Sequence, residues 1–421
     1  MLSKLGFLKD YHSFSKMIKL RIVLLLISVF FNATVMPYVV VYFVERVGIN
    51  KASLMVLGVG IAGILGGLLG GKLGDKYGRK KMIILGEIGT GIGFFLACFS
   101  SVFTEMLIAI IFISFLLIYF FSGLSGPAYS AYIIDETTNK NRKSVYVVLL
   151  WVSNLSFALG SILGGFLFKQ YSSLLFFLVG CSSILSCICI AIFIQDHFIK
   201  RKVETNNIRV KNQLKPNSNK LKVYQHMLKA PIFRFLVLLT LILSLMNNQL
   251  PYYLSVHYVN IFETEGYTIL GFLRSENTLI IFFLTFVITN LLKKVYEMIS
   301  LLFGVMLFFI GYIALSMGEI PSILYIAMAI MSIGQIIYSP VIQTISADVI
   351  PDEHRSTYLS ILDVIGHIGG LCAFLFVPLM QYIQPFKISI IYGVFGFISL
   401  IIIYRIKQNR KEVKSTITNV S

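Results

Sequence analysis

Residues 71–81 read Gly71-Lys72-Leu73-Gly74-Asp75-Lys76-Tyr77-Gly78-Arg79-Lys80-Lys81. The stretch lies between two apolar segments and combines three glycines, one acidic residue and five basic residues. Glycines allow a tight turn and a close approach of two helices, and a carboxylate is stabilised near a helix N-terminus. The pattern therefore predicts a short, positively charged turn that joins two helices and lies against a third.

On both sides of this turn the chain consists of apolar segments about 20 residues long. Of its 421 residues, 57% are hydrophobic and 13% are charged, and the mean hydropathy is +0.83. In soluble domains roughly 45–50% of the residues are apolar and about 25% are charged. Such a segment crosses a hydrocarbon layer of about 30 Å as a helix, in which the backbone groups are paired internally. We therefore predict an all-α polytopic membrane protein with twelve spans. They are residues 20–44, 53–72, 82–101, 105–126, 145–168, 174–195, 233–258, 267–291, 297–317, 321–345, 357–380 and 387–406.

The lysines and arginines indicate how these spans are oriented. With both termini in the cytoplasm, all but five of the 36 fall in cytoplasmic segments, as the positive-inside rule requires. The exceptions are Arg46, Lys51, Lys169 and Lys387 on the outer side and Arg274 within a span. The net charge of +17 thus reflects topology and attraction to anionic lipids on the cytoplasmic side. It does not indicate nucleic-acid binding.

An internal repeat divides the chain into two halves. The repeat consists of Pro127, Asp135 and Arg142, which recur with one offset of 213 residues as Pro340, Asp348 and Arg355. Duplicated halves of this kind are typical of transporters with a binding site near the membrane midplane. The predicted organisation is an N-terminal interfacial segment (1–19), a six-helix bundle (20–195), a basic linker (196–232), a second six-helix bundle (233–406) and a C-terminal tail (407–421).

The stretch at 71–81 resembles the G-x-L-x-D-R/K-x-G-R/K-R/K signature of the major facilitator superfamily, in the expected loop between helices 2 and 3. The resemblance implies two pseudo-symmetric six-helix bundles that work by alternating access. It also implies that Asp75 faces the start of helix 11 and that Arg79 pairs with Asp135. The matching turn of the second half, residues 292–297, lacks the glycines, so the gate is expected to be asymmetric. The predicted cytoplasmic gate comprises Gly71, Asp75, Gly78, Arg79, Asp135, Arg142, Asp348 and Arg355.

Helix 5 carries a second resemblance. Residues 154–165 are similar to the antiporter motif of the multidrug/proton antiporter branch, with Ser161 where that family usually carries proline. Helix 4 also lacks the arginine that many members place there for proton coupling. The resemblance implies proton-coupled efflux of hydrophobic or amphipathic small molecules.

Ionisable residues within spans are costly and are functional candidates by default. Glu276 in helix 8 is too short to reach the interface, so it is expected to face a wet cavity or a partner and to carry a proton. A neutral structural carboxyl is the alternative. In helix 11, Asp363 and His367 share a face; they either exchange a proton or reinforce the helix start and the gate. Glu87, near the end of helix 3, is expected to contact basic loop residues.

Polar residues in the spans predict the substrate cavity. Amides hydrogen-bond a substrate or, alternatively, join helices. Arg274 either faces the cavity or extends outward along its aliphatic stem, and Trp151 forms an aromatic wall or packs in the core. The predicted cavity residues are Asn32, Trp151, Asn154, Asn247, Asn248, Gln249, Arg274, Gln335 and Tyr338.

The leading functional prediction is a monomeric, proton-driven exporter in a bacterial plasma membrane, with both termini cytoplasmic. Uptake of a nutrient such as a peptide or sugar is the alternative within the same fold. A membrane scaffold or channel is the alternative of another class. No phosphate loop, zinc spacing or Ser–His–Asp set occurs in the sequence, so we predict neither an enzyme nor a bound cofactor or metal.

The predicted topology can be tested by cysteine labelling. In a variant without the native cysteines, Lys76→Cys and Lys211→Cys should react with a membrane-impermeant maleimide from the cytoplasmic side only. Lys169→Cys, predicted to lie outside, is the matched control and should react from the opposite side. Labelling of positions 76 and 211 from opposite faces would refute the two-bundle arrangement.

Overall fold

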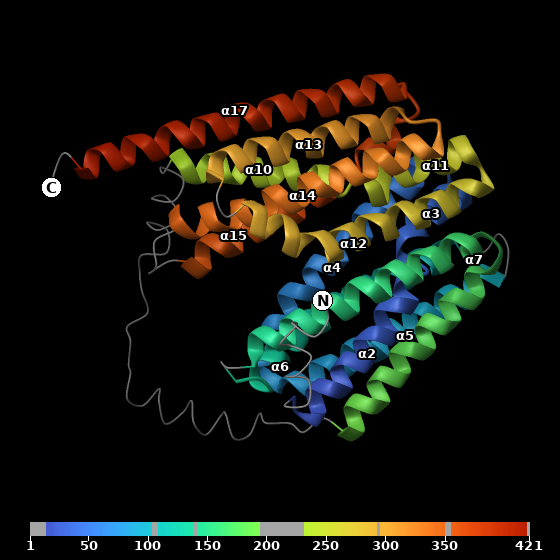
Figure 1. Ribbon diagram of the computed structural model, residues 1–421. Coiled ribbons are helices and arrows are strands. Elements are labelled where there is room, and N and C mark those ends of the chain that lie inside the picture. The colour runs from blue at the N-terminus through green and yellow to red at the C-terminus, as the bar shows by residue number, and fades with distance from the viewer. Residues whose placement is uncertain are drawn as a thin grey trace, which may run out of the picture. The chain divides into compact units, whose positions relative to one another are not determined.

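The computed structural model describes residues 14–102, 108–138, 141–193, 231–292, 295–349 and 355–418, and most of these are helical (Figure 1). The chain divides into two compact units. Unit 1 comprises residues 1–214 together with 270–275, and unit 2 comprises residues 215–269 and 276–421. Much of the predicted N-terminal segment (1–19) and nearly all of the linker (196–232) lie outside the described residues.

Unit 1 begins with a span that bends at a proline. Its first helix starts at an N-cap, because the Ser15 hydroxyl accepts the backbone N–H of Ile18 at 3.2 Å. Pro37 lacks a backbone N–H, and the span is divided there by a short 3₁₀ turn. The helices are α2 (Lys16–Ala33), η3 (Met36–Tyr38), α3 (Val39–Val47), α4 (Ile49–Tyr77), α5 (Arg79–Val102), α6 (Ile108–Asp135) and α7 (Arg142–Phe193).

Unit 2 repeats this plan with a similar interruption in its first span. After α10, residues 250–254 form a π-helical turn at Pro251, in which the Leu254 N–H donates to the Gln249 carbonyl at 2.9 Å. The helix α17 continues beyond residue 406, so most of the predicted tail is helical. The elements are α10 (Pro231–Asn247), η4 (Leu250–Leu254), α11 (Ser255–Phe262), α12 (Thr264–Leu292), α13 (Glu297–Met317), α14 (Pro321–Val349), α15 (Arg355–Ala373), α16 (Phe376–Leu379) and α17 (Pro385–Thr418).

Among the described residues, eleven helical segments are long and apolar enough to cross a membrane. One of them, Ser144–Phe193, has 50 residues and would measure about 75 Å as a continuous helix. Its backbone is non-helical at Tyr171 (φ −125°, ψ 32°), and Figure 1 shows α7 doubling back on itself. This segment therefore crosses twice, and the prediction of an all-helical protein with twelve spans is confirmed.

The packing within the two units follows a common pattern. In unit 1, α2 packs against α7, and α5 packs against α6 and α7. In unit 2, α10 packs against α15, and α13 packs against α14 and α17. These pairs correspond between the units, which agrees with the pseudo-symmetry expected from the internal repeat. The extensive packing of α4 against α6 has no counterpart of similar size between α12 and α14 among the described residues.

Glycines of α4 bring this helix unusually close to α6. A Cβ atom added at Gly66 would lie 2.0 Å from the Phe120 carbonyl oxygen, and one added at Gly70 would lie 2.2 Å from that of Leu124. Helices in lipid associate through such small residues because the lipid tails are themselves apolar. Gly71 is different, since nothing lies within 4 Å of an added Cβ atom.

Gly70 and Gly71 provide a matched pair for testing this contact. We expect Gly70→Ala to force α4 and α6 apart and to lower stability by about 1–3 kcal/mol. Gly71→Ala should leave the melting temperature in detergent unchanged or raise it slightly, since alanine favours the helix. Equal melting temperatures for the two variants would contradict the close contact between α4 and α6.

Candidate functional site

Unit 1 contains a cavity of about 610 Å³. Its lining comes from α2, η3, α4, α5, α6 and α7, and it includes both apolar and polar side chains. Ligand pockets in proteins typically measure about 300–1,000 Å³, so the cavity has room for a small molecule. The lining side chains that carry a polar group are Arg21, Ser28, Asn32, Glu87, Thr90, Tyr119, Ser122, Ser125, Tyr129 and Ser183.

Three of the lining residues form a connected polar cluster. The hydroxyl of Tyr129 in α6 donates a hydrogen bond to the Glu87 carboxylate in α5, at 2.5 Å. The guanidinium of Arg21 in α2 lies over the face of the same ring, 3.7 Å from the carbon to the ring centroid. Three helices therefore bring one acidic, one basic and one aromatic side chain together at the cavity wall.

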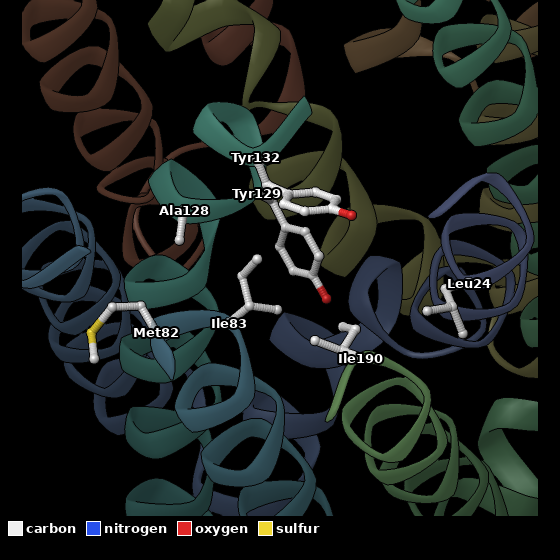
Figure 2. Close-up of a cluster of buried hydrophobic side chains, with 7 residues drawn as sticks. All are labelled: Leu24, Met82, Ile83, Ala128, Tyr129, Tyr132 and Ile190. Carbon is white, nitrogen blue, oxygen red and sulfur yellow. The ribbon is translucent and has the colours of Figure 1, made fainter. Parts of the chain in front are cut away.

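Tyr129 is held in place by a buried hydrophobic cluster. The ring is only 9% exposed and packs with Ile83 of α5 and Ile190 of α7. Figure 2 shows the ring reaching from α6 towards Ile190. Because four helices contribute to the cluster, the hydroxyl points at Glu87 as a consequence of core packing. The members are Leu24, Met82, Ile83, Ala128, Tyr129, Tyr132 and Ile190.

This cluster was not predicted from the sequence. Glu87 was expected to contact basic loop residues, and the structure corrects this, because Glu87 bonds to Tyr129 inside the cavity. The helix begins at Arg79, three residues before the predicted span, so Glu87 lies about 12 Å along it at 1.5 Å per residue. Glu87 lies within the predicted span 82–101, so the reasoning applied to Glu276, an acidic residue within a span, could also have identified Glu87.

The predicted gate residues of unit 1 lie around the turns after α4 and α6. Gly78 ends α4 with a positive φ of 98°, a conformation that favours glycine. Arg79 forms an ion pair with Asp135 and donates to the Ala131 carbonyl. Asp75 is exposed, and its predicted contact with helix 11 stays a prediction.

Arg142 acts at the end of α6. Its guanidinium donates to the Ile134 and Thr137 carbonyls, both at 3.2 Å. Basic groups stabilise the unpaired carbonyls and the negative end of a helix dipole in this way. Asp348 lies in the last turn of α14 and Arg355 is the first residue of α15, but their side chains lie outside the described residues.

The predicted amides of unit 2 bond mostly to their own unit. Asn247 donates to the Tyr338 hydroxyl at 2.8 Å, and Asn248 donates to the Ser244 carbonyl one turn back. Gln249 is fully buried; it accepts from the Tyr392 hydroxyl at 2.9 Å and donates to the Ala373 carbonyl at 3.5 Å. For Gln249 the structure therefore favours the packing alternative.

Polar side chains of α12 and α14 also form a hydrogen-bonded cluster. Asn277 donates to the Ser332 hydroxyl at 2.8 Å and to the Gln335 side chain at 3.4 Å. The neighbouring Glu276 has one carboxylate oxygen that is buried without a hydrogen-bond partner among the described residues. Tyr325 of α14 lies within electrostatic range of this carboxylate. Glu276 is thus a half-buried carboxyl beside a hydrogen-bonded polar network.

The other predicted residues are more dispersed. On one exposed face of α15, the Nε2 atom of His367 lies 3.7 Å from the Oδ2 atom of Asp363. Arg274, in the part of α12 grouped with unit 1, has its guanidinium carbon 6.0 Å from the ring centroid of Phe157, which lines the cavity. Trp151 and Asn154 are half-buried on α7 and do not line this cavity; of the predicted cavity residues, Asn32 does. In the described part of the chain, no group of three His, Cys, Asp or Glu side chains forms a metal site.

Two helical units with twelve spans and a cavity among membrane helices define a polytopic transporter. The sequence profile of the Major Facilitator Superfamily matches residues 22–374 and 279–417, and the chain belongs to this family. A relative, the Na(+), Li(+), K(+)/H(+) antiporter of Planococcus maritimus, is 24% identical over 382 residues, which cover 87% of this chain and 89% of the relative.

Solved structures show the same fold at low sequence identity. A D-xylose-proton symporter superposes with a TM-score of 0.70 at 13% identity, covering 93% of this chain and 97% of that one. The peptide transporter POT in complex with sulfate gives a TM-score of 0.68 at 15% identity, covering 94% of each chain. These similarities support the fold. They do not indicate which substrate this protein transports.

The contrast between Asn32 and Gln249 generates a prediction. Gln249→Leu should lower stability by about 1–3 kcal/mol per buried polar group left unpaired, because the Tyr392 hydroxyl loses its acceptor. Asn32→Ala should change transport far more than stability, because the amide lines the cavity. Thermal melting and transport of both variants in the same detergent and lipid check this. A stable Gln249→Leu protein with altered transport would reverse the two assignments.

Proposed function

We propose that the protein is a proton-coupled antiporter that exports small amphipathic cations by alternating access. The observation that carries this proposal is the carboxyl of Glu87 in the wall of the unit 1 cavity, bonded to Tyr129 and close to Arg21. An ionised carboxylate attracts a cation, whereas a protonated carboxyl does not. Proton and cation therefore compete for one group, which is the requirement for exchange.

The cavity walls support an amphipathic solute. Leu25, Val29 and Ile118 provide apolar surface, while Asn32 and Thr90 provide hydrogen-bonding groups. Two charges 4 Å apart interact by about 4 kcal/mol at an effective dielectric constant of 20. One carboxylate is thus sufficient to favour a cation over a neutral molecule of the same shape.

Other residues take supporting roles in the proposal. Glu276, Asp363 and His367 remain candidates for proton transfer in unit 2, and Arg274 lies beside a cavity residue. Arg79, Asp135 and the other predicted gate residues hold one side of the transporter closed during part of the cycle. We place the protein in a bacterial plasma membrane, with both termini cytoplasmic.

A second candidate is exchange of alkali cations for protons. It is favoured by the relative named as a Na(+), Li(+), K(+)/H(+) antiporter. The carboxylate and hydroxyl oxygens of the cavity are suitable donors for hard cations. Nutrient uptake, the alternative from the sequence, is distinguished by the direction of solute movement. A symporter moves its solute in the same direction as the protons, whereas an antiporter moves it in the opposite direction.

Glu87→Gln tests the coupling site. In proteoliposomes with an imposed pH gradient, this variant should lose proton-driven movement of an organic cation by about tenfold or more, because glutamine carries no exchangeable charge. Glu276→Gln is the matched variant in unit 2. Adding NaCl, LiCl or KCl in place of the organic cation separates the two candidate functions.

The outcomes discriminate among the carboxyl groups. Full coupling in Glu87→Gln together with lost coupling in Glu276→Gln would move the proton site to unit 2. If none of the tested cations causes the wild-type protein to dissipate the pH gradient, antiport of cations is refuted.

A further inference from the structure

Arg21 and Tyr129 make a contact that the proposed exchange does not by itself require. The guanidinium carbon lies 3.7 Å from the centroid of the Tyr129 ring, well inside the limit of about 6 Å for cation–π interactions. The hydroxyl of the same ring bonds to Glu87. The Tyr129 ring and the Glu87 carboxylate thus lie side by side, and the Arg21 guanidinium covers the face of the ring.

An aromatic face beside a carboxylate is also the chemistry that recognises organic cations from solution. Guanidinium and alkylammonium groups are bound in this manner because the ring quadrupole and the carboxylate both attract positive charge. The position of the Arg21 guanidinium is therefore one that a solute cation in the same cavity would occupy.

Displacing Arg21 from the ring breaks no hydrogen bond between its Nε atom and the described residues. Its Nε atom is buried and has no hydrogen-bond partner among the described residues, so ring contact and charge account for its placement. The cavity of about 610 Å³ adjoins both Arg21 and Tyr129. Space is thus available for the side chain to swing off the ring.

The second half of the chain lacks this arrangement. Arg234 lies near the start of α10, the helix that corresponds to α2, and its side chain is exposed. At the repeat offset of 213 residues Tyr129 corresponds to Ile342, and α13, the helix that corresponds to α5, has no acidic residue after Glu297 in its first turn. The arginine is present in both halves, but the acid and the ring occur only in the first. Arg234 is therefore a matched control for Arg21.

We propose that Arg21 is a tethered stand-in for the exported cation, which covers the Tyr129 face beside Glu87 when the cavity is empty and is displaced when an organic cation enters. This inference rests on the proposed function and adds a specificity-determining residue to it. An internal competitor lowers the affinity for solute. It also keeps the carboxylate compensated after the solute has left.

Equilibrium binding of tetraphenylphosphonium to the purified full-length protein, without any gradient, tests the inference. Arg21→Gln should tighten binding by about tenfold, because the tethered competitor is removed. Tyr129→Leu should weaken binding, since the aromatic face is lost. Arg234→Gln should bind as the wild type does. Tetraphenylborate, an anion of the same shape, should gain no affinity from Arg21→Gln through the cation site.

Melting temperatures accompany each binding measurement, and Arg21→Lys provides a second variant in case the glutamine variant does not fold. Lysine keeps the charge but stacks less well on a ring than arginine, so binding should again be tighter than in the wild type. Unchanged or weaker binding in folded Arg21→Gln or Arg21→Lys would overturn the inference. Absence of tetraphenylphosphonium binding in all proteins would do the same and would favour alkali cations.

The inference and the proposed function fail separately. If removing Arg21 tightens tetraphenylphosphonium binding but the wild type shows no proton-driven export, the inference about Arg21 stands and the antiport proposal fails. If a pH gradient drives cation export but the affinity for the cation does not depend on Arg21, the antiport proposal stands and the inference about Arg21 fails.

Discussion

Within lipid, every backbone N–H and C=O group must find its partner inside the chain, and the structure of this protein depends on that requirement. It restricts the spans to helices and places the unpaired groups at helix ends. Basic side chains serve those ends, since Arg142 bonds to carbonyls at the end of α6 and Lys80 donates to the Ala191 carbonyl of α7 at 2.8 Å. The basic residues from which the topology is predicted thus also complete the helices.

The same requirement governs polar side chains between the helices, and the two units meet it differently. In unit 2, pairs such as Asn247 with Tyr338 and Gln249 with Tyr392 satisfy one another. In unit 1, glycines draw α4 onto α6, and the polar groups of Arg21 and Glu87 border a cavity. These amides and tyrosines of unit 2 thus serve in packing, whereas Arg21 and Glu87 of unit 1 line a cavity.

Much of the fold was predictable, because twelve apolar segments and a one-sided distribution of Lys and Arg have few arrangements in a membrane. The breaks at Pro37 and Pro251 were not predicted, because a missing N–H group does not by itself interrupt a helix, and Pro127 and Pro340 lie inside α6 and α14. The candidate site was predicted poorly. Glu87 was placed near the end of its helix and expected to contact basic loop residues, because hydropathy locates the apolar centre of a helix, whereas α5 begins within the basic residues that precede it.

The sequence alone therefore determined the helical class, the twelve spans, the predicted orientation and the resemblance to the family, since each depends on local composition or on the order of segments. Only the tertiary structure decided which polar side chains meet. Arg21, Glu87 and Tyr129 come from three helices, and their contact depends on the rotation of each helix about its axis. That rotation is set by the packing of Ile83 and Ile190 around the tyrosine ring, and no pattern along a single helix records it.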